Sequence, residues 1–317
     1  SIHLQGWLAA YAERRYGAKS AAAEKAWMYL LEGPYRRGTN GTERSSIVAA
    51  RPALDVKKSG PNAGLGIPYE PMLVIQAQAQ LLKDADKLAA SKPYRFDIVD
   101  VQRQMMTNLG QLVHKKAAEA FVAKDRAAFA LHSRRFLELL SDMDELLYTR
   151  SEYSFDKWLT EARSWGETKE EKDLMERDAT SLVTIWGADG DPRIFDYSWR
   201  EWAGLINGYY LPRWQKFYTM LQGHLDAGTD YQEEGLPLAY GREDFRANDF
   251  YNQLADWELA YVVQTDKART PVTRGDELVI TRRLFDKYLK LSREYYTDFS
   301  GVEEIKEERT YENVGEE

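Results

Sequence analysis

The chain has 317 residues, of which 44% are hydrophobic and 13% aromatic, so it is long enough to bury a substantial core. Its formal net charge of −8 argues against nucleic-acid binding, which needs a concentrated basic patch. Cysteine is absent, which excludes disulfides and thiolate chemistry. No segment approaches the roughly 20 apolar residues of a membrane span, so no membrane span is expected.

Helical periodicity begins almost at the first residue. The chain opens on Ser1 without a signal peptide or an initiator methionine, which suggests a processed or excised piece. The first helix is expected to stop at Gly17 and the second at Gly33-Pro34. Residues 35–71 are rich in glycine and proline and predict a long loop or extended excursion, of the kind that is often functional.

Helices are predicted next over residues 70–90 and 94–123. Asp125 can cap the following helix, and Thr168 with Glu171 forms a capping box at the start of another. Further helices are expected at the ranges 155–165, 168–186, 197–224 with a kink at Pro212, 242–265 and 274–298.

Strand patterns are sparse, with residues 236–240 and 278–281 as the only candidates. Residues 301–317 form an acidic tail that is weakly hydrophobic and expected to be flexible. The pattern therefore predicts an all-α domain of about ten helices over residues 1–300.

No residue set specifies catalysis or metal binding. The histidines have no partner at metal-ligand spacing, so no metal site or cofactor is expected; they are His3, His114, His132 and His224. Asp97 and Asp100 lie on one face of a predicted helix beside Arg95 and Arg103. This arrangement fits a general acid–base pair or a structural ion-pair cluster that bridges two helices, and the second interpretation is favoured.

One turn is distinctive because it joins two predicted helices and is bracketed by large apolar rings. It runs from Trp186 to Tyr197 and contains the polar sequence Asp-Gly-Asp-Pro. Asp196, or Ser198 together with Glu201, can cap the helix that follows. An exposed Trp beside a Tyr can support a sugar ring, although the residues alone favour structural packing of these rings.

The segment 186–197, followed by the sequence WAGLINGYYLPRW at 202–214, resembles the C-terminal domain of the alpha-N-acetylglucosaminidases, glycoside hydrolase family 89. Three further stretches resemble the family's motifs in the same order, namely RRYG at 14–17, RPAL at 51–54 and RFDIVD with RQ at 95–104. The resemblance extends over nearly the whole chain, to about residue 296.

The resemblance implies a helical domain that packs against an upstream (β/α)8-type barrel absent from this chain. It also implies retaining hydrolysis by two glutamates, about 5 Å apart, which both lie in that barrel, so no catalytic residue is expected here. Trp186, Ile194 and Tyr197 match the positions that line the pocket around the sugar and its N-acetyl group.

The implied ligand is the terminal alpha-linked N-acetylglucosamine of heparan-type or mucin-type glycans. The implied location is outside the cytoplasm, periplasmic or secreted in a bacterium and lysosomal in an animal. An excised domain is expected to expose an apolar patch, with Trp186, Tyr197 and residues 35–71 at its rim. The alternatives are a free-standing helical module that binds carbohydrate or protein, and an independent all-α glycosidase.

Overall fold

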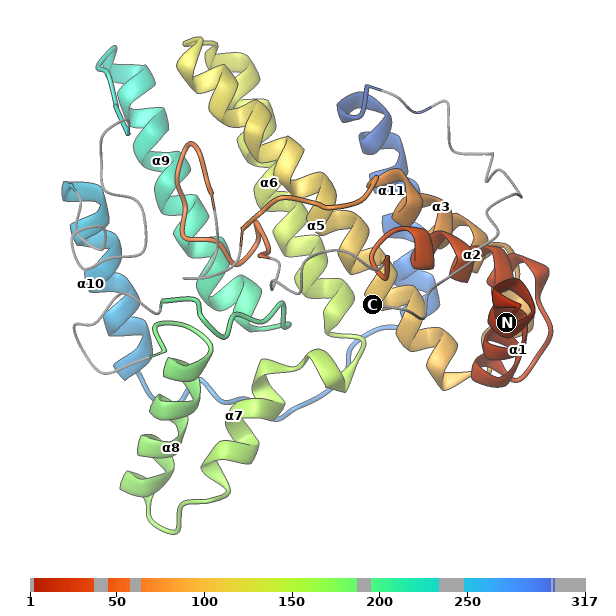
Figure 1. Ribbon diagram of the computed structural model, residues 1–317. Helices are drawn as coiled ribbons and strands as arrows, with labels where there is room; N and C mark the ends of the chain where they lie inside the picture. Colours follow the sequence, from red (N-terminus) through yellow and green to blue (C-terminus); the bar gives the residue numbers. More distant parts are fainter. Residues whose placement is uncertain are drawn as a thin grey trace, which may run out of the picture. The chain divides into compact units, whose positions relative to one another are not determined.

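A computed structural model of the chain describes residues 3–36, 45–57, 64–186, 195–233, 248–297 and 299. Across these ranges the chain forms eleven α-helices and no named strand, which confirms the all-α class (Figure 1). None of these helices has the length and the apolar character needed to cross a membrane. Ile194, the candidate strand 236–240 and the tail 301–317 lie outside the described residues.

The chain divides into two compact units, both helical. The first unit combines residues 1–40, 67–105 and 276–317, and the second combines residues 41–66 and 106–275. The first contains α1 (Leu4–Tyr16), α2 (Ala21–Glu32), α3 (Met72–Lys83), α4 (Ala85–Leu88), the start of α5 (Lys92–Val122) and α11 (Glu277–Tyr295).

Local sequence explains most helix ends in the first unit. Gly17 ends α1 with a left-handed φ of 76°, and Gly33 ends α2, as predicted. The helix predicted over 70–90 is instead interrupted at Asp84, whose carboxylate accepts a hydrogen bond from the Ser20 hydroxyl at 2.6 Å. A contact from far along the chain therefore divides what local periodicity reads as one helix.

The strand suggested at 278–281 is wrong, because these residues belong to α11. Asp276 caps this helix by accepting hydrogen bonds from the backbone N–H groups of Leu278 and Val279. Leu278, Thr281, Leu284 and Tyr288 are buried, which is helical spacing.

The second unit holds the rest of α5 and six further helical elements. These are α6 (Arg126–Leu147), α7 (Phe155–Arg163), α8 (Lys169–Leu182), the π-helix η3 (Ile206–Tyr210), α9 (Leu211–Ala227) and α10 (Asp249–Val263), with a short 3-10 turn, η1 (Ser151–Tyr153). Asp125 caps α6 and Thr168 forms its capping box with Glu171, both as predicted.

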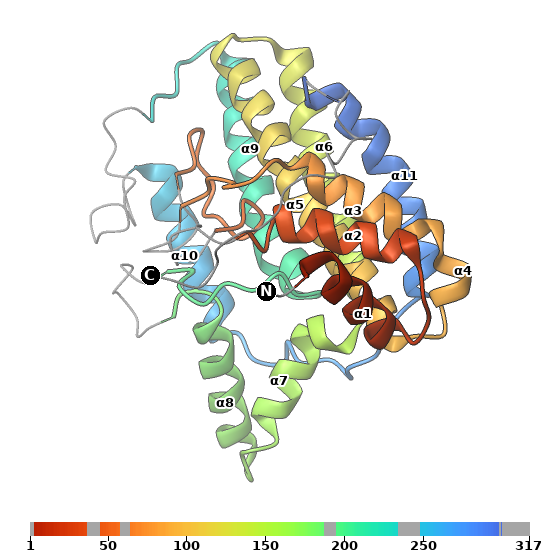
Figure 2. The ribbon, with the colours of Figure 1, turned by 45° about the vertical axis from the view of Figure 1, so that its right-hand side comes forward.

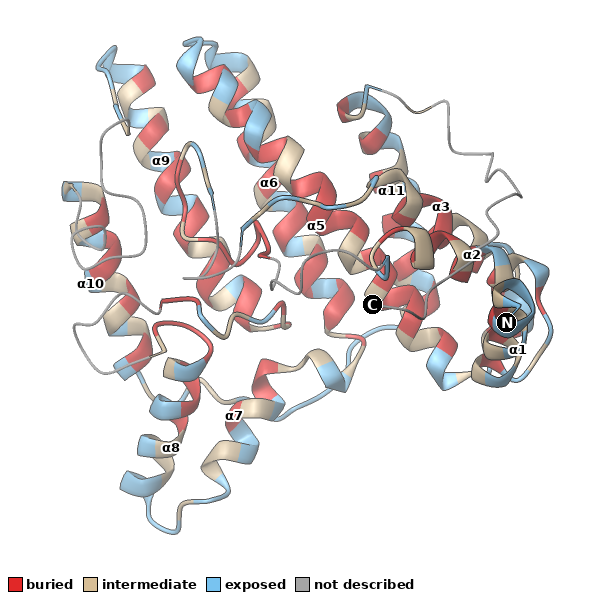
Figure 3. Cartoon of the chain, viewed as in Figure 1, coloured by how far each residue is buried: buried red, intermediate tan, exposed pale blue. Residues whose placement is uncertain are grey.

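Helices α6 and α9 lie side by side in both views (Figure 1, Figure 2). Each has one buried and one exposed side (Figure 3). Aromatic rings from the two helices pack against each other: Phe136 on α6 lies 4.7 Å from Trp214 on α9, centroid to centroid. His114 is buried beside them, with its ring nitrogens 2.8 Å from the Tyr218 hydroxyl and 2.9 Å from the Ala53 carbonyl. His114 is thus an ordinary core histidine.

The helix predicted over 197–224 is wrong in its first part, because no helix forms before the π-helix at 206. Ala203 instead pairs with the chain at Ser154, donating to the Tyr153 carbonyl and accepting from the Phe155 N–H. Glu201 is buried and accepts hydrogen bonds, so neither it nor Ser198 caps a helix there. Pro212 stands in the first turn of α9 and does not kink a longer helix.

The stretch Ile47–Ala50, within the predicted excursion, is fully buried in the second unit. The indole N–H of Trp214 donates to the Val48 carbonyl at 3.3 Å. This part of the excursion is therefore core, and the expectation that it would rim an exposed patch is wrong here.

Candidate functional site

Trp186 and Tyr197 lie together, although ten residues separate them in the sequence. Their ring centroids are 4.8 Å apart with the ring planes tilted by 59°. Tyr197 is 41% exposed and Trp186 is partly exposed, so the pair faces solvent instead of filling the core. Ile194, the third predicted site residue, lies outside the described residues.

The neighbours of the two rings anchor them on α10. Ile185, which precedes Trp186, and Phe195, two residues before Tyr197, are both buried. They pack in one apolar cluster with residues of α10, namely Ala255 and Val262, flanked by Leu259. Burial of two large side chains beside the rings holds both ends of the turn to the same helix.

The backbone at both rings is unusual. Trp186 has a φ of 65° and Asp196 a φ of 56°, the left-handed region that costs a non-glycine residue about 1–2 kcal/mol. The Trp186 N–H donates to the Ser181 carbonyl at 2.5 Å, and the Asp196 N–H donates to the Thr184 carbonyl at 2.7 Å. Such conformations persist where surrounding contacts determine them, and they concentrate at functional sites.

A cluster of buried charges lies directly behind Tyr197. Arg213 on α9 donates through Nη1 to both carboxylate oxygens of Asp196 at 3.1 Å. The same Nη1 donates to Glu258 Oε1 on α10 at 3.3 Å, and Arg51 contacts the other oxygen of Glu258 at 3.2 Å. The side chains of Arg213, Asp196 and Glu258 have zero exposure.

Burial is costly for an ionised carboxylate and raises the pKa of Asp196 to about 7, against the opposing attraction of Arg213. When both carboxylates are ionised, the two acidic and two basic side chains balance in charge. Sequence reasoning assigned Asp196 to a helix cap and gave Arg213 no role. The sequence did contain a sign of the buried charge: Arg213 lies four residues before Phe217, on the helical face where an apolar core residue is expected.

The arrangement is suited to binding rather than to catalysis. Two partly exposed aromatic rings can stack on the apolar face of a sugar, while the charges behind them already neutralise one another. Among the residues that the structure describes, no group of acidic and histidine side chains is placed to hold a metal ion.

The carboxylates weighed as an acid–base pair are structural. Asp97 accepts from Arg15 through both of its oxygens at 2.6 Å and from the Tyr16 hydroxyl at 2.7 Å. Asp100 pairs with Arg103 one turn away at 2.9 Å. The favoured interpretation, an ion-pair cluster that bridges two helices, is therefore confirmed, because Arg15 on α1 pairs with Asp97 on α5.

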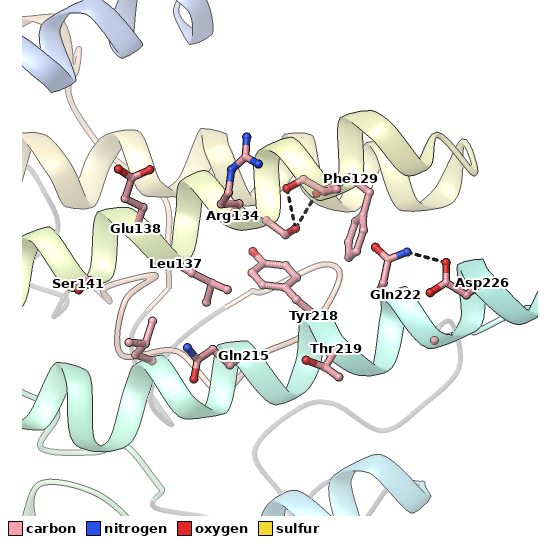
Figure 4. Close-up of a pocket in the computed structure, with 14 residues that line it drawn as sticks. Phe129, Arg134, Leu137, Glu138, Ser141, Gln215, Tyr218, Thr219, Gln222 and Asp226 are labelled. Atoms are coloured by element: carbon pink, nitrogen blue, oxygen red, sulfur yellow. Dashed lines mark hydrogen bonds between the residues drawn. The ribbon is translucent and has the colours of Figure 1, made fainter.

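A groove of about 930 Å³ lies between α6 and α9 in this unit (Figure 4). Two of the polar side chains that line it have partners within the unit. The Ser133 hydroxyl donates to the Phe129 carbonyl at 2.7 Å, and the side chain of Gln222 donates to Asp226 at 2.9 Å (Figure 4). Neither Trp186 nor Tyr197 lines this groove, so it is separate from the ring pair.

Comparison with known proteins gives concordant results. A family model described as the alpha-N-acetylglucosaminidase (NAGLU) C-terminal domain matches residues 7–287. The human alpha-N-acetylglucosaminidase is 32% identical over 291 residues, which cover 90% of this chain and 36% of the human protein.

Two solved structures of a family 89 glycoside hydrolase from Clostridium perfringens are also similar. The complex with PUGNAc has a TM-score of 0.77 and 27% identity, covering 93% of this chain and 32% of that one. A glutamine-substituted form, in complex with its substrate GlcNAc-alpha-1,4-galactose, has a TM-score of 0.79 and 26% identity, covering 93% and 33%. The chain therefore spans about a third of the length of these relatives.

Proposed function

Because this chain belongs to the family of alpha-N-acetylglucosaminidase C-terminal domains, we propose that it forms part of the sugar pocket of a glycoside hydrolase. The enzyme removes terminal alpha-linked N-acetylglucosamine from glycans. The observation that carries this proposal is the Trp186–Tyr197 pair, two rings held 4.8 Å apart and left partly open to solvent.

The roles divide between this chain and an upstream barrel of the same enzyme. The two catalytic glutamates belong to the barrel, and this chain supplies binding surface only. Trp186 forms a hydrophobic wall, while Tyr197 and Ile194 line the space around the sugar ring and its N-acetyl group. An apolar wall of this kind excludes water from the reacting centre and orients the sugar.

The substrate class is a glycan that ends in alpha-linked N-acetylglucosamine, of heparan or mucin type. The substrate bound by the Clostridium relative, GlcNAc-alpha-1,4-galactose, supports this choice. The enzyme acts outside the cytoplasm, in the periplasm or medium of a bacterium or in the lysosome of an animal, and needs no cofactor.

The test is hydrolysis of a chromogenic alpha-N-acetylglucosaminide by the complete enzyme and by its Trp186→Ala variant. Loss of the wall is expected to lower kcat/KM by at least about tenfold, because the sugar is bound less firmly and positioned less well. Trp165→Ala is the matched control. Trp165 is 83% exposed where α7 turns into α8, and its removal should leave kcat/KM unchanged.

Equal activity of wild type and Trp186→Ala would contradict the proposal. Activity of this chain without the barrel would also contradict it, since the catalytic pair would then have to lie within the chain. Sugar binding by the isolated chain, with no contribution to hydrolysis, would instead support the free-standing carbohydrate-binding module.

A further inference from the structure

We infer that Asp196 and Arg213 are positioning residues, whose buried ion pair fixes the backbone turn that holds Tyr197 against Trp186. The inference rests on the proposed function, because it explains how the ring pair acquires its geometry. It assigns a role in substrate binding to two side chains that have zero exposure themselves.

Both the backbone N–H and the side-chain carboxylate of Asp196 have hydrogen-bond partners. Its backbone N–H donates to the Thr184 carbonyl at 2.7 Å, and its carboxylate accepts from Arg213 Nη1 at 3.1 Å through each oxygen. With both groups fixed, the residue keeps its left-handed φ of 56°. The next peptide carries Tyr197, so the direction in which its ring leaves the backbone depends on this residue.

Arg213 is a firm anchor because it is itself fixed on several sides. Its Nη2 donates to the Ala49 carbonyl at 2.8 Å, and Nη1 reaches Glu258 at 3.3 Å. Its guanidinium carbon lies 4.7 Å from the centroid of the Tyr209 ring, within cation–π range. A planar guanidinium with this many partners has one orientation, which a lysine cannot reproduce.

The competing explanation is that the ion pair only stabilises the fold. The two explanations differ in how a change at Asp196 depends on Trp186. A purely structural role lowers the amount of folded enzyme and has the same effect with or without the Trp186 ring. A positioning role acts through the ring pair, so it vanishes once one ring has been removed.

Asp196→Asn is the informative change because it removes the charge and preserves the size. Asparagine also tolerates the left-handed region, so the variant does not add backbone strain. In the complete enzyme we expect Asp196→Asn to raise KM for a chromogenic alpha-N-acetylglucosaminide about tenfold, with kcat changed less than about twofold. The same change in a Trp186→Ala background is expected to alter kcat/KM less than about twofold.

Asp97→Asn is the matched control. Asp97 belongs to the other unit, is also buried and also binds an arginine through both oxygens, Arg15 at 2.6 Å. It should lower the Tm while leaving KM unchanged. If circular dichroism shows that Asp196→Asn does not fold, Arg213→Lys replaces it in the comparison with and without Trp186. Lysine keeps the positive charge but lacks the planar guanidinium that donates several hydrogen bonds.

The outcomes separate the inference from the proposed function. An unchanged KM for Asp196→Asn, or an equal loss of kcat/KM in the two backgrounds, would overturn the positioning role while Trp186→Ala still impaired the enzyme. No loss with Trp186→Ala would overturn the proposed function itself. A loss seen only when Trp186 is present supports the inference.

Discussion

Arg213 carries a full positive charge at zero side-chain exposure, where it is tolerated only because Asp196 and Glu258 neutralise it. Removing one partner of such a cluster leaves the others buried without compensation. The cost of that state exceeds the cost of losing an exposed ion pair, because the remaining charge cannot recover its hydration.

We therefore expect Arg213→Leu to lower the free energy of unfolding by about 3–5 kcal/mol. Urea unfolding of the chain, followed by circular dichroism, measures this. Arg282→Ala is the comparison, because Arg282 and its partner Asp86 have side-chain exposures of 47% and 91%, and it should cost less than about 1 kcal/mol. Similar losses in the two variants would mean that the buried cluster is not a source of stability.

At the level of residues, the sequence predicted that Trp186 and Tyr197 lie close together, which the structure shows, but not which contacts hold them there. The two rings bracket a turn that is legible locally, from a glycine stop and a polar turn sequence. The partner of Asp196 is Arg213 on α9, 17 residues away, and Arg213 also pairs with Glu258 on α10, 45 residues further along the chain. Asp196 was read as a cap because capping is the commonest local use of an aspartate near a helix start.

Among the elements, the α7–α8 hairpin depends on close packing at Gly166. A Cβ added there would lie 2.6 Å from the backbone nitrogen of Lys172 and 2.8 Å from the carbonyl carbon of Glu171. Both contacts are with backbone at the start of α8, which cannot move aside as a flexible side chain would. Any side chain at this position must displace the first turn of α8.

Gly166→Ala should consequently destabilise the chain by about 1–3 kcal/mol, the usual cost of overpacking. Gly223→Ala is the matched control, since Gly223 is exposed within α9 and its added Cβ would have no neighbour within 4 Å. Alanine there should stabilise the chain by up to about 1 kcal/mol through helix propensity. Thermal unfolding of both variants measures the difference, and a neutral Gly166→Ala would refute the packing argument.

Helix ends were predicted correctly where a local capping residue or glycine determines them. Gly17, Asp125 and Thr168 each mark a helix end that forms as predicted. The prediction of a helix over residues 197–205 is wrong. Their apolar pattern fits a helix, but pairing of Ala203 with the chain at Ser154 fixes another backbone conformation. Tertiary contacts of this kind outweigh helix propensity, which differs by less than about 1 kcal/mol between most residues.

For the molecule as a whole, the free energy of unfolding depends on pH through two buried groups whose pKa values are shifted in opposite directions, Asp144 upward and His114 downward. Burial raises the pKa of Asp144 from 3.8 to about 6, even though Gly204 and Asn207 donate hydrogen bonds to its carboxylate. Its folded pKa is higher than its unfolded pKa. The stability it contributes is therefore complete below pH 3.8 and is lost as pH rises through about 6.

Burial lowers the pKa of His114 from 6.5 to about 4, so its contribution is present above pH 6.5 and is lost as pH falls toward 4. We expect the stability of wild type relative to Asp144→Asn to fall by about 3 kcal/mol between pH 4 and pH 7. Relative to His114→Gln, the difference should rise over the same range. Urea unfolding at several pH values tests both slopes, and slopes of the same sign would contradict the assignment.

The first unit is assembled from segments that lie far apart in the sequence, and α11 is the last of them to be made. Arg95 on α5 pairs with Asp276 and Glu277 at 2.9 and 2.8 Å, and α11 packs against α3. On the ribosome, α1 to α3 emerge early but must wait roughly 10–30 s, while residues 106–275 are synthesised, before α11 arrives. A stop codon anywhere in that interval would release a chain that lacks α11, and with it the partners of Arg95 and the packing on α3.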